Sequence, residues 1–202
     1  MSTKPEFSAD IVSVDGAGRP SDRGRLFVTG SKVRIEASDA ASGFFLIDGE
    51  LGNAWFIRPA EQLFMDARQS TTLTQLFVRV DSDDPCRALH EAALRAAGAI
   101  TAGQWSCERS TDLSESAGAK PRWLRYRIVA TNGQLRESRI DAALQFPVKW
   151  RYADGTVIEL AHIRLATQPQ RLFALPVKYR KLDPGALVER IRHSDVWANP
   201  PQ

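Results

Sequence analysis

Alternation of apolar and polar residues between positions 24 and 66 predicts a run of consecutive antiparallel strands. Residues 32–36 read Lys-Val-Arg-Ile-Glu, and because neighbouring side chains of a strand point to opposite faces, one face is buried and the other solvated. Gly30-Ser31 and Asp48-Gly49 are typical hairpin turns, and Pro59 interrupts pairing because it lacks an N–H. Together with the β-rich runs on either side, these signals predict a meander with strands at residues 25–29, 32–36, 44–47, 54–57 and 62–65.

The rest of the chain adds more strands and two helices. Asp84 and Pro85 are an N-cap and a first-turn proline, and they predict a helix that ends before Gly98. Asp183-Pro184 repeats the signal for a second helix over residues 184–192. Residues 71–80 are amphipathic under either period, so their type stays open, and residues 111–120 are rich in Ser, Gly and Ala, which indicates a loop. The same strand patterns predict strands at residues 7–14, 124–129, 146–152, 157–164 and 172–176.

The length and composition suit one domain. The chain has 202 residues, of which 43% are hydrophobic, so it can bury a sizeable core. We expect a single domain over residues 1–202, ordered from about residue 7 to 197. No run of roughly 18 apolar residues is present, so we expect no membrane-spanning helix. The first five residues lack the apolar core of a signal peptide, so the chain is cytoplasmic if Met1 is native; the abrupt start of strand pattern at Phe7 is instead typical of a trimmed leader.

Large aromatic residues are more numerous in the predicted sheet than a flat sheet needs. Each must remove on the order of 150–250 Å² from water, so the sheet must curl or be covered. The rings either fill an ordinary core or line a cavity for an apolar ligand. We predict that eight residues face the interior: Phe27, Val33, Ile35, Phe45, Trp55, Phe64, Trp150 and Tyr152.

The net charge of +3 is unevenly distributed. Residues 1–119 hold 12 Lys and Arg against 17 Asp and Glu, whereas residues 120–202 hold 15 against 7. Cationic residues in the predicted strands of the second part alternate with apolar ones, which predicts either a plain solvated face or a surface for anionic lipid headgroups or an acidic protein. The residues of this predicted basic face are Arg125, Arg127, Arg136, Arg139, Lys149 and Arg151. Nucleic acid is not expected, because Trp150 and Tyr152 alternate away from the cations and offer no stacking surface.

Cys86 and Cys107 flank the predicted helix in the middle of the chain. A disulfide between them would close a loop of about 20 residues and stabilise the fold by roughly 3 kcal/mol, in an oxidising compartment. The alternative is a pair of buried free thiols. A metal site is not expected, because the sequence has neither a Cys-x-x-Cys motif nor a His cluster beside them.

Two segments of the meander resemble a known family. Residues 47–49, Ile-Asp-Gly, followed by residues 54–59, Ala-Trp-Phe-Ile-Arg-Pro, are similar to the D-G-x-x-L-W-x-x-x-P hairpin of the bacterial periplasmic lipoprotein carriers, the LolA/LolB-like superfamily, with two extra residues in the turn. Residues 26–28 and 33–36 resemble the strands that precede this hairpin. An uncharacterised bacterial branch of the superfamily shows the same later order, here at Ile140-Asp141, 146–149, Gly155, 159–160, 172–176 and Tyr179.

The resemblance implies an α+β fold: a strongly curved antiparallel sheet, or incomplete barrel, with the helices at 85–97 and 184–192 as a lid over an apolar cavity. In carriers of this type the cavity takes acyl chains, and the proteins are periplasmic or associated with the outer membrane. This chain differs at residues 30–32, Gly-Ser-Lys, where the carriers have an arginine that helps to control the lid.

From these observations we predict a non-enzymatic envelope protein that binds a lipid, acyl chain or other hydrophobic molecule. The alternative is a module that uses the basic face on a membrane surface or an envelope protein. An enzyme is less favoured, because His90, His162 and His193 are far apart in sequence and no Gly-x-Ser-x-Gly motif or phosphate loop is present. No cofactor, catalytic residue or metal is expected.

Overall fold

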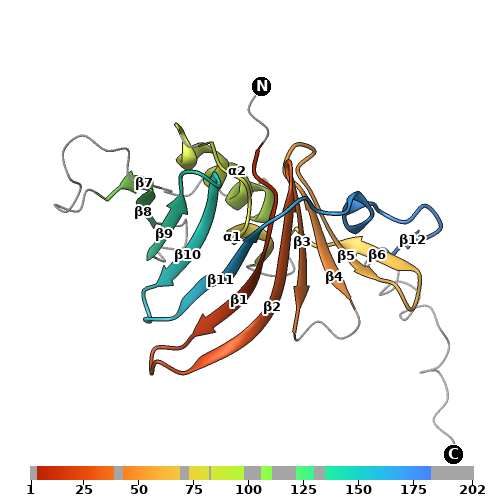
Figure 1. The fold of residues 1–202 in the computed structure, drawn as a ribbon, viewed down its shortest axis with the longest axis horizontal. Coiled ribbons are helices and arrows are strands. Elements are labelled where there is room, and N and C mark those ends of the chain that lie inside the picture. The colour runs from red at the N-terminus through yellow and green to blue at the C-terminus, as the bar shows by residue number, and fades with distance from the viewer. Residues whose placement is uncertain are drawn as a thin grey trace, which may run out of the picture.

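The computed structural model describes residues 4–38, 43–68, 73–81, 83–97, 106–110, 122–129 and 135–182. In these residues twelve strands form one sheet, in the order β12-β6-β5-β4-β3-β2-β1-β11-β10-β9-β8-β7 (Figure 1). The elements, in chain order, are β1 (Phe7–Val14), β2 (Pro20–Thr29), β3 (Lys32–Ala37), β4 (Phe44–Asp48), β5 (Asn53–Arg58), β6 (Leu63–Asp66), α1 (Leu73–Leu76), α2 (Pro85–Ala97), β7 (Ser106–Arg109), β8 (Trp123–Val129), β9 (Leu135–Asp141), β10 (Phe146–Tyr152), β11 (Val157–Leu165), the 3-10 helix η1 (Gln170–Phe173) and β12 (Arg180–Lys181).

Strand β1 joins the two halves of the sheet. It pairs antiparallel with β2 on one side and with β11 on the other. The strands from β2 to β6 then follow one another as the predicted meander, and the strands from β11 back to β7 form the other half. The N-terminal strand is therefore central in the sheet, with β7 and β12 at opposite ends (Figure 1).

One face of the sheet, here called the inner face, packs against α1, α2 and residues 77–80. Leu76, Phe77 and Leu89 are buried there with apolar side chains from both halves of the sheet. The Phe146 ring lies edge-on to Phe7, with centroids 5.3 Å apart, and parallel to Phe77 at 6.4 Å. These rings fill the space between α1 and the centre of the sheet.

The opposite, outer face carries a second apolar cluster at one end of the sheet. Phe44, Leu46 and Ile57 are buried there under the segment that contains η1, whose Phe173 is also buried. Arg34 fixes this segment, since its Nη1 donates to the Leu172 carbonyl oxygen at 3.2 Å. The segment then adds β12, which pairs parallel with the edge strand β6.

The expectation of an α+β fold with a helical lid is wrong. Strands make up nearly all the regular structure of the described residues, α1 has only four residues, and residues 77–80, which cover much of the inner face, are irregular. The pattern of residues 71–80 fits both a helix and a strand. Its apolar residues pack against the sheet both within α1 and in the irregular segment 77–80, so their spacing follows neither period alone. The predicted helix 184–192 and the predicted loop 111–120 lie outside the described residues.

The predicted strand at 172–176 is also wrong. Residues 170–173 form η1, which follows Pro169, and the chain continues in an extended conformation across the outer face without pairing. A run of apolar residues predicts a strand here, but these residues pack over the sheet instead: Phe173 is buried, and Leu172 and Leu175 pack against the same outer cluster. Propensity for a strand does not distinguish these two cases.

The predicted disulfide is confirmed. Cys86 in α2 and Cys107 in β7 are bonded, with their Cα atoms 5.8 Å apart. The bond ties the helix to an edge strand, and it is compatible with a protein that works in an oxidising, extracytoplasmic compartment. Among the described helices, none has the length and apolar character needed to cross a bilayer.

Candidate functional site

Five of the six residues of the predicted basic face lie together on the outer face of β8, β9 and β10. In β8, Arg125 and Arg127 are exposed while Leu124, Tyr126 and Ile128 are buried. The cross-strand register places Arg125 beside Arg139 and Arg139 beside Lys149. The alternation predicted from the sequence is thus confirmed for Arg125, Arg127, Arg139, Lys149 and Arg151, which are called the outer basic face below.

Arg136 does not belong to this surface. It pairs with Ile128 in β8 and with Tyr152 in β10, both of which belong to the inner side of the sheet. Its guanidinium carbon lies 5.2 Å from the centroid of the Tyr152 ring. Arg136 and Arg139 are three residues apart, an odd separation, so one strand places them on opposite faces.

Trp123 lies at the start of β8 on the same side as Arg125. The ring is 36% exposed, and the guanidinium carbons of Arg122 and Arg139 lie 4.6 and 4.9 Å from its centroid. Guanidinium groups are attracted to the negative face of an indole. The outer basic face therefore has an aromatic ring that the sequence analysis did not assign to it.

The cations of the outer basic face are only partly neutralised. Lys149 Nζ forms an ion pair with Glu159 Oε2 at 2.6 Å. Within the described residues, Arg127, Arg139 and Arg151 form no ion pair, although Glu137 faces both Arg127 and Arg151 across the strands. Three cations without an ion-pair partner give the surface a positive field.

The eight predicted interior residues are divided between two clusters. Val33, Ile35, Phe45 and Trp150 are buried on the inner face, and Tyr152 packs against that cluster with partial exposure. Phe27, Trp55 and Phe64 belong instead to the outer cluster under η1. The prediction that these three residues face the interior is wrong. In β2, for example, the fully buried residues of the inner face are Leu26 and Val28, the neighbours of Phe27.

The inner face is closely filled around α1. The indole Nε1 of Trp150 donates to the Leu76 carbonyl oxygen at 3.1 Å, which satisfies the polar atom of a buried ring. Three pockets are lined by described residues, and none of the three is lined by any of the eight predicted residues.

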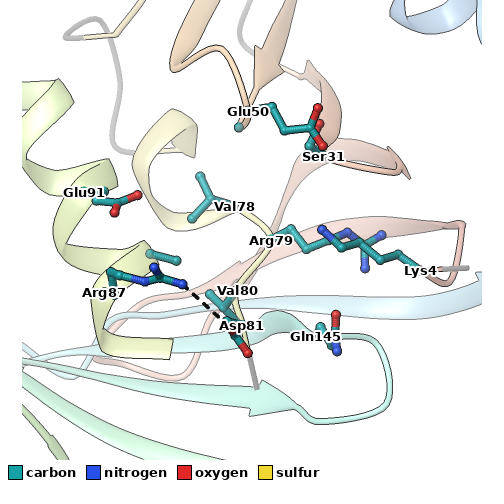
Figure 2. Close-up of a pocket in the computed structure, with 12 residues that line it drawn as sticks. Lys4, Ser31, Glu50, Val78, Arg79, Val80, Asp81, Arg87, Glu91 and Gln145 are labelled. Carbon is teal, nitrogen blue, oxygen red and sulfur yellow. Dashed lines mark ion pairs between the residues drawn. The ribbon is translucent and has the colours of Figure 1, made fainter. Parts of the chain in front are cut away.

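One of these pockets lies where α2 meets the loops at one end of the sheet (Figure 2). It encloses about 390 Å³ and mixes both signs of charge: Lys4, Ser31, Glu50, Arg79, Asp81, Arg87, Glu91 and Gln145 contribute its polar side chains. Arg87 in α2 pairs with Asp81, with Nη2 and Oδ2 3.6 Å apart.

Arg79 is the most constrained side chain of this pocket, and the sequence analysis did not single it out. Its three nitrogens donate to main-chain oxygens of Gly30, Leu144 and Pro5, at 2.5, 2.7 and 2.6 Å. Burial lowers the pKa of Arg79 to about 10, while the charge of Glu6 acts to raise it. A guanidinium whose three nitrogens all donate to main-chain carbonyls holds loops together, so this pocket is a structural junction.

Comparisons with known proteins give a likeness in fold alone. No family model and no curated protein matches the sequence. Two crystal structures of PNGF-II, in the C2 and P21 space groups, are similar to 94% of this chain with a TM-score of 0.51, at 10% and 8% identity. The chain spans about a third of the length of these structures, 33% and 34%. At such identities the likeness shows that this β-rich architecture occurs within a larger protein, and it does not identify a family.

Proposed function

We propose that the protein is a binding module of the bacterial envelope that docks on the anionic headgroups of a bilayer through its outer basic face. The observation that carries the proposal is Trp123, a partly exposed indole between the guanidinium groups of Arg122 and Arg139. Indole rings favour the boundary between water and lipid. Each nearby Lys or Arg contributes about 1 kcal/mol toward an anionic membrane surface.

The arrangement of the cations favours a membrane surface over a protein as the binding partner. Arg127, Arg139 and Arg151 project from three adjacent strands, and neighbouring strands lie about 4.8 Å apart. These side chains thus lie side by side on one surface, which offers several cations to a layer of headgroups. The disulfide is consistent with this location, because an oxidising compartment preserves it.

Flotation with lipid vesicles tests the proposal. The wild-type protein is expected to float with phosphatidylcholine vesicles that contain phosphatidylglycerol and not with phosphatidylcholine alone. Reversing the two unpaired arginines, Arg127→Glu with Arg151→Glu, is expected to weaken binding at least tenfold, since four units of charge change at about 1 kcal/mol each. Trp123→Ala is expected to weaken binding even in low salt, where screening is least.

A matched control has the same change in net charge at a distant part of the outer side. Arg171 and Lys178 are exposed and form no ion pair within the described residues, so Arg171→Glu with Lys178→Glu is the control pair. Equal loss in both pairs would show a response to net charge alone and would overturn the proposal. Binding to double-stranded DNA or to an acidic protein, without binding to vesicles, would overturn it as well.

A second candidate is the binding of an acyl chain or other apolar ligand on the inner face, as the resemblance to the lipoprotein carriers implies. It is supported by Phe56, Tyr152 and Ile163, which pack against the inner cluster but remain partly exposed. Native mass spectrometry of protein purified from cells tests it. A bound lipid mass would support this function; a ligand-free mass together with no uptake of a fluorescent fatty acid would contradict it.

A further inference from the structure

The outer face is hollowed where β1 passes between two irregularities in the sheet. The register with β11 shifts between Ser8 and Asp10, and the register with β2 shifts between Ile11 and Val12. β-bulges bend a strand and redirect its side chains, and they are frequent beside functional sites. The resulting hollow of about 620 Å³ has the charged or titratable side chains of Asp10, Asp22, Arg25, His162 and Arg164 in its lining.

His162 is held in an unusual conformation at the first irregularity. Its φ is 49°, in the left-handed region that disfavours most side chains. Such a conformation costs of order 1–3 kcal/mol and persists where the surrounding structure enforces it. Here it directs the imidazole to the outer face, where Nδ1 lies 2.8 Å from Oδ2 of Asp10.

The contact with Asp10 fixes which ring nitrogen of His162 carries a proton. A carboxylate only accepts hydrogen bonds, so Nδ1 carries the proton and donates it to Asp10. Nε2 has no hydrogen-bond partner among the described residues, and the side chain is 72% exposed. Nε2 is therefore available to accept a proton from a hydroxyl group, or to donate one when the ring is an imidazolium.

The guanidinium groups around the hollow are not equivalent. Arg25 faces Asp10, with Nε 3.9 Å from Oδ1, so both carboxylate oxygens of Asp10 are engaged. Asp22 accepts from the main-chain N of Gly24 at 2.8 Å, on the β2 side. Arg164 makes no hydrogen bond or ion pair within the described residues. It faces β1 two residues beyond His162, so the groups left to bind a ligand gather on the β11 side.

We propose that the hollow binds a phosphate group, as a phosphate monoester or diester, between Arg164 and Nε2 of His162, with Asp10 as the positioning residue of the imidazole. A guanidinium matches two phosphate oxygens in a bidentate contact. The tetrahedral group presents further oxygens to Nε2, and this nitrogen accepts from a P–OH or donates to a P–O⁻. The phosphate comes either from a soluble phosphoester or from a lipid headgroup.

The test uses NMR titration of the whole protein with inorganic phosphate, glycerol phosphate and glycerol. The imidazole signals of His162 are expected to shift with both phosphates and not with glycerol. His162→Asn keeps a residue that tolerates the left-handed conformation, and Arg164→Gln keeps a donor without the charge. Each is expected to weaken phosphate binding at least tenfold, while Arg171→Gln, an exposed position on η1, leaves it unchanged.

Circular dichroism verifies that the variants remain folded. Equal shifts of the main-chain amide signals around the hollow in wild type, His162→Asn and Arg164→Gln would show diffuse attraction of anions and would overturn the proposal, as would the absence of any shift in the wild type. Displacement of glycerol phosphate by phosphatidylglycerol vesicles would assign the phosphate to a headgroup, and retention would assign it to a soluble ester. This site is separate from the outer basic face. The double variant Arg127→Glu with Arg151→Glu is therefore expected to leave the titration with glycerol phosphate unchanged.

Discussion

Arg79 Nε lies 2.5 Å from the main-chain oxygen of Gly30, in the turn between β2 and β3. The same guanidinium also binds carbonyl oxygens of Leu144 and Pro5. One half-buried side chain therefore joins the N-terminal segment, a hairpin of one half of the sheet and a loop of the other half.

Replacing this group is expected to destabilise the fold strongly. Arg79→Met removes the donors to two partly buried carbonyls, of Leu144 and Pro5, and to the exposed carbonyl of Gly30. Each buried unsatisfied group costs about 1–3 kcal/mol, so we expect a loss of at least about 2 kcal/mol in the free energy of unfolding. Urea denaturation measures it. Arg87→Met is the control, since the ion pairs of Arg87 with Asp81 and Asp84, at 3.6 and 3.7 Å, are exposed and are worth about 0–1 kcal/mol. Similar losses in both variants would show that the contacts of Arg79 are not structural.

Glu6 is expected to make stability depend on pH in the acid range. The main-chain N of Gln168 and the hydroxyl of Thr29 donate to its carboxylate at 2.6 and 2.8 Å. These bonds, with the charge of Arg79, lower the pKa of Glu6 below its ordinary value of 4.5. A carboxyl whose pKa is lower in the folded state stabilises the fold above its unfolded pKa, and the contribution is lost as pH falls through the folded pKa.

Glu6→Gln removes this titration. The difference in unfolding free energy between wild type and variant is expected to be largest above about pH 4.5 and to shrink as the pH falls. Denaturation series at several pH values measure it. A constant difference down to low pH would mean that the ionised carboxylate is not what stabilises the junction.

The disulfide is expected to contribute roughly 3 kcal/mol, because it closes a loop between residues 21 positions apart. Reduction should lower the urea midpoint of the wild type. The double variant Cys86→Ala with Cys107→Ala should have the lower midpoint from the start and respond to reductant no further. A wild-type midpoint that is insensitive to complete reduction would refute this estimate.

Two glycines with positive φ are expected to differ in their tolerance of a side chain. A Cβ on Gly24 would lie 2.0 Å from the Glu36 carbonyl oxygen, whereas a Cβ on Gly18 would meet nothing within 4 Å. Gly18→Ala should cost about 1–2 kcal/mol, from the left-handed backbone alone. Gly24→Ala should cost clearly more, because β2 and β3 must also separate, and thermal unfolding of the two variants compares them directly.

Alternation along a strand predicted correctly which side of the sheet each residue faces where only every second residue is apolar. In β8 the arginines could lie on one side only, so Arg125 and Arg127 were placed correctly. In β2 and β5 both parities are apolar, because η1 covers the outer face of that half. In such a strand the alternation shows that Phe27 and Leu26 face opposite sides of the sheet, but it does not show which of them faces the larger cluster.

The groups that make the candidate sites come together over long separations. Asp10 and His162 are 152 residues apart, and their contact exists because β11 returns to pair with β1. Trp123 is flanked by Arg122, the residue before it in the sequence, and by Arg139 in the next strand, which depends on the register. No local pattern carries either relationship.

The sequence by itself determined the meander and its turns, the strands at 7–14, 124–129, 146–152 and 157–164, the helix at 85–97, the basic second half and the pair of cysteines, because these follow from side-chain periodicity, turn chemistry and composition within short windows. The tertiary structure alone decided that β1 lies in the middle of the sheet, that both of its faces are covered at one end, and that His162 meets Asp10. These features depend on pairing between distant strands, which is selected by the packing of the whole chain rather than by any segment of it.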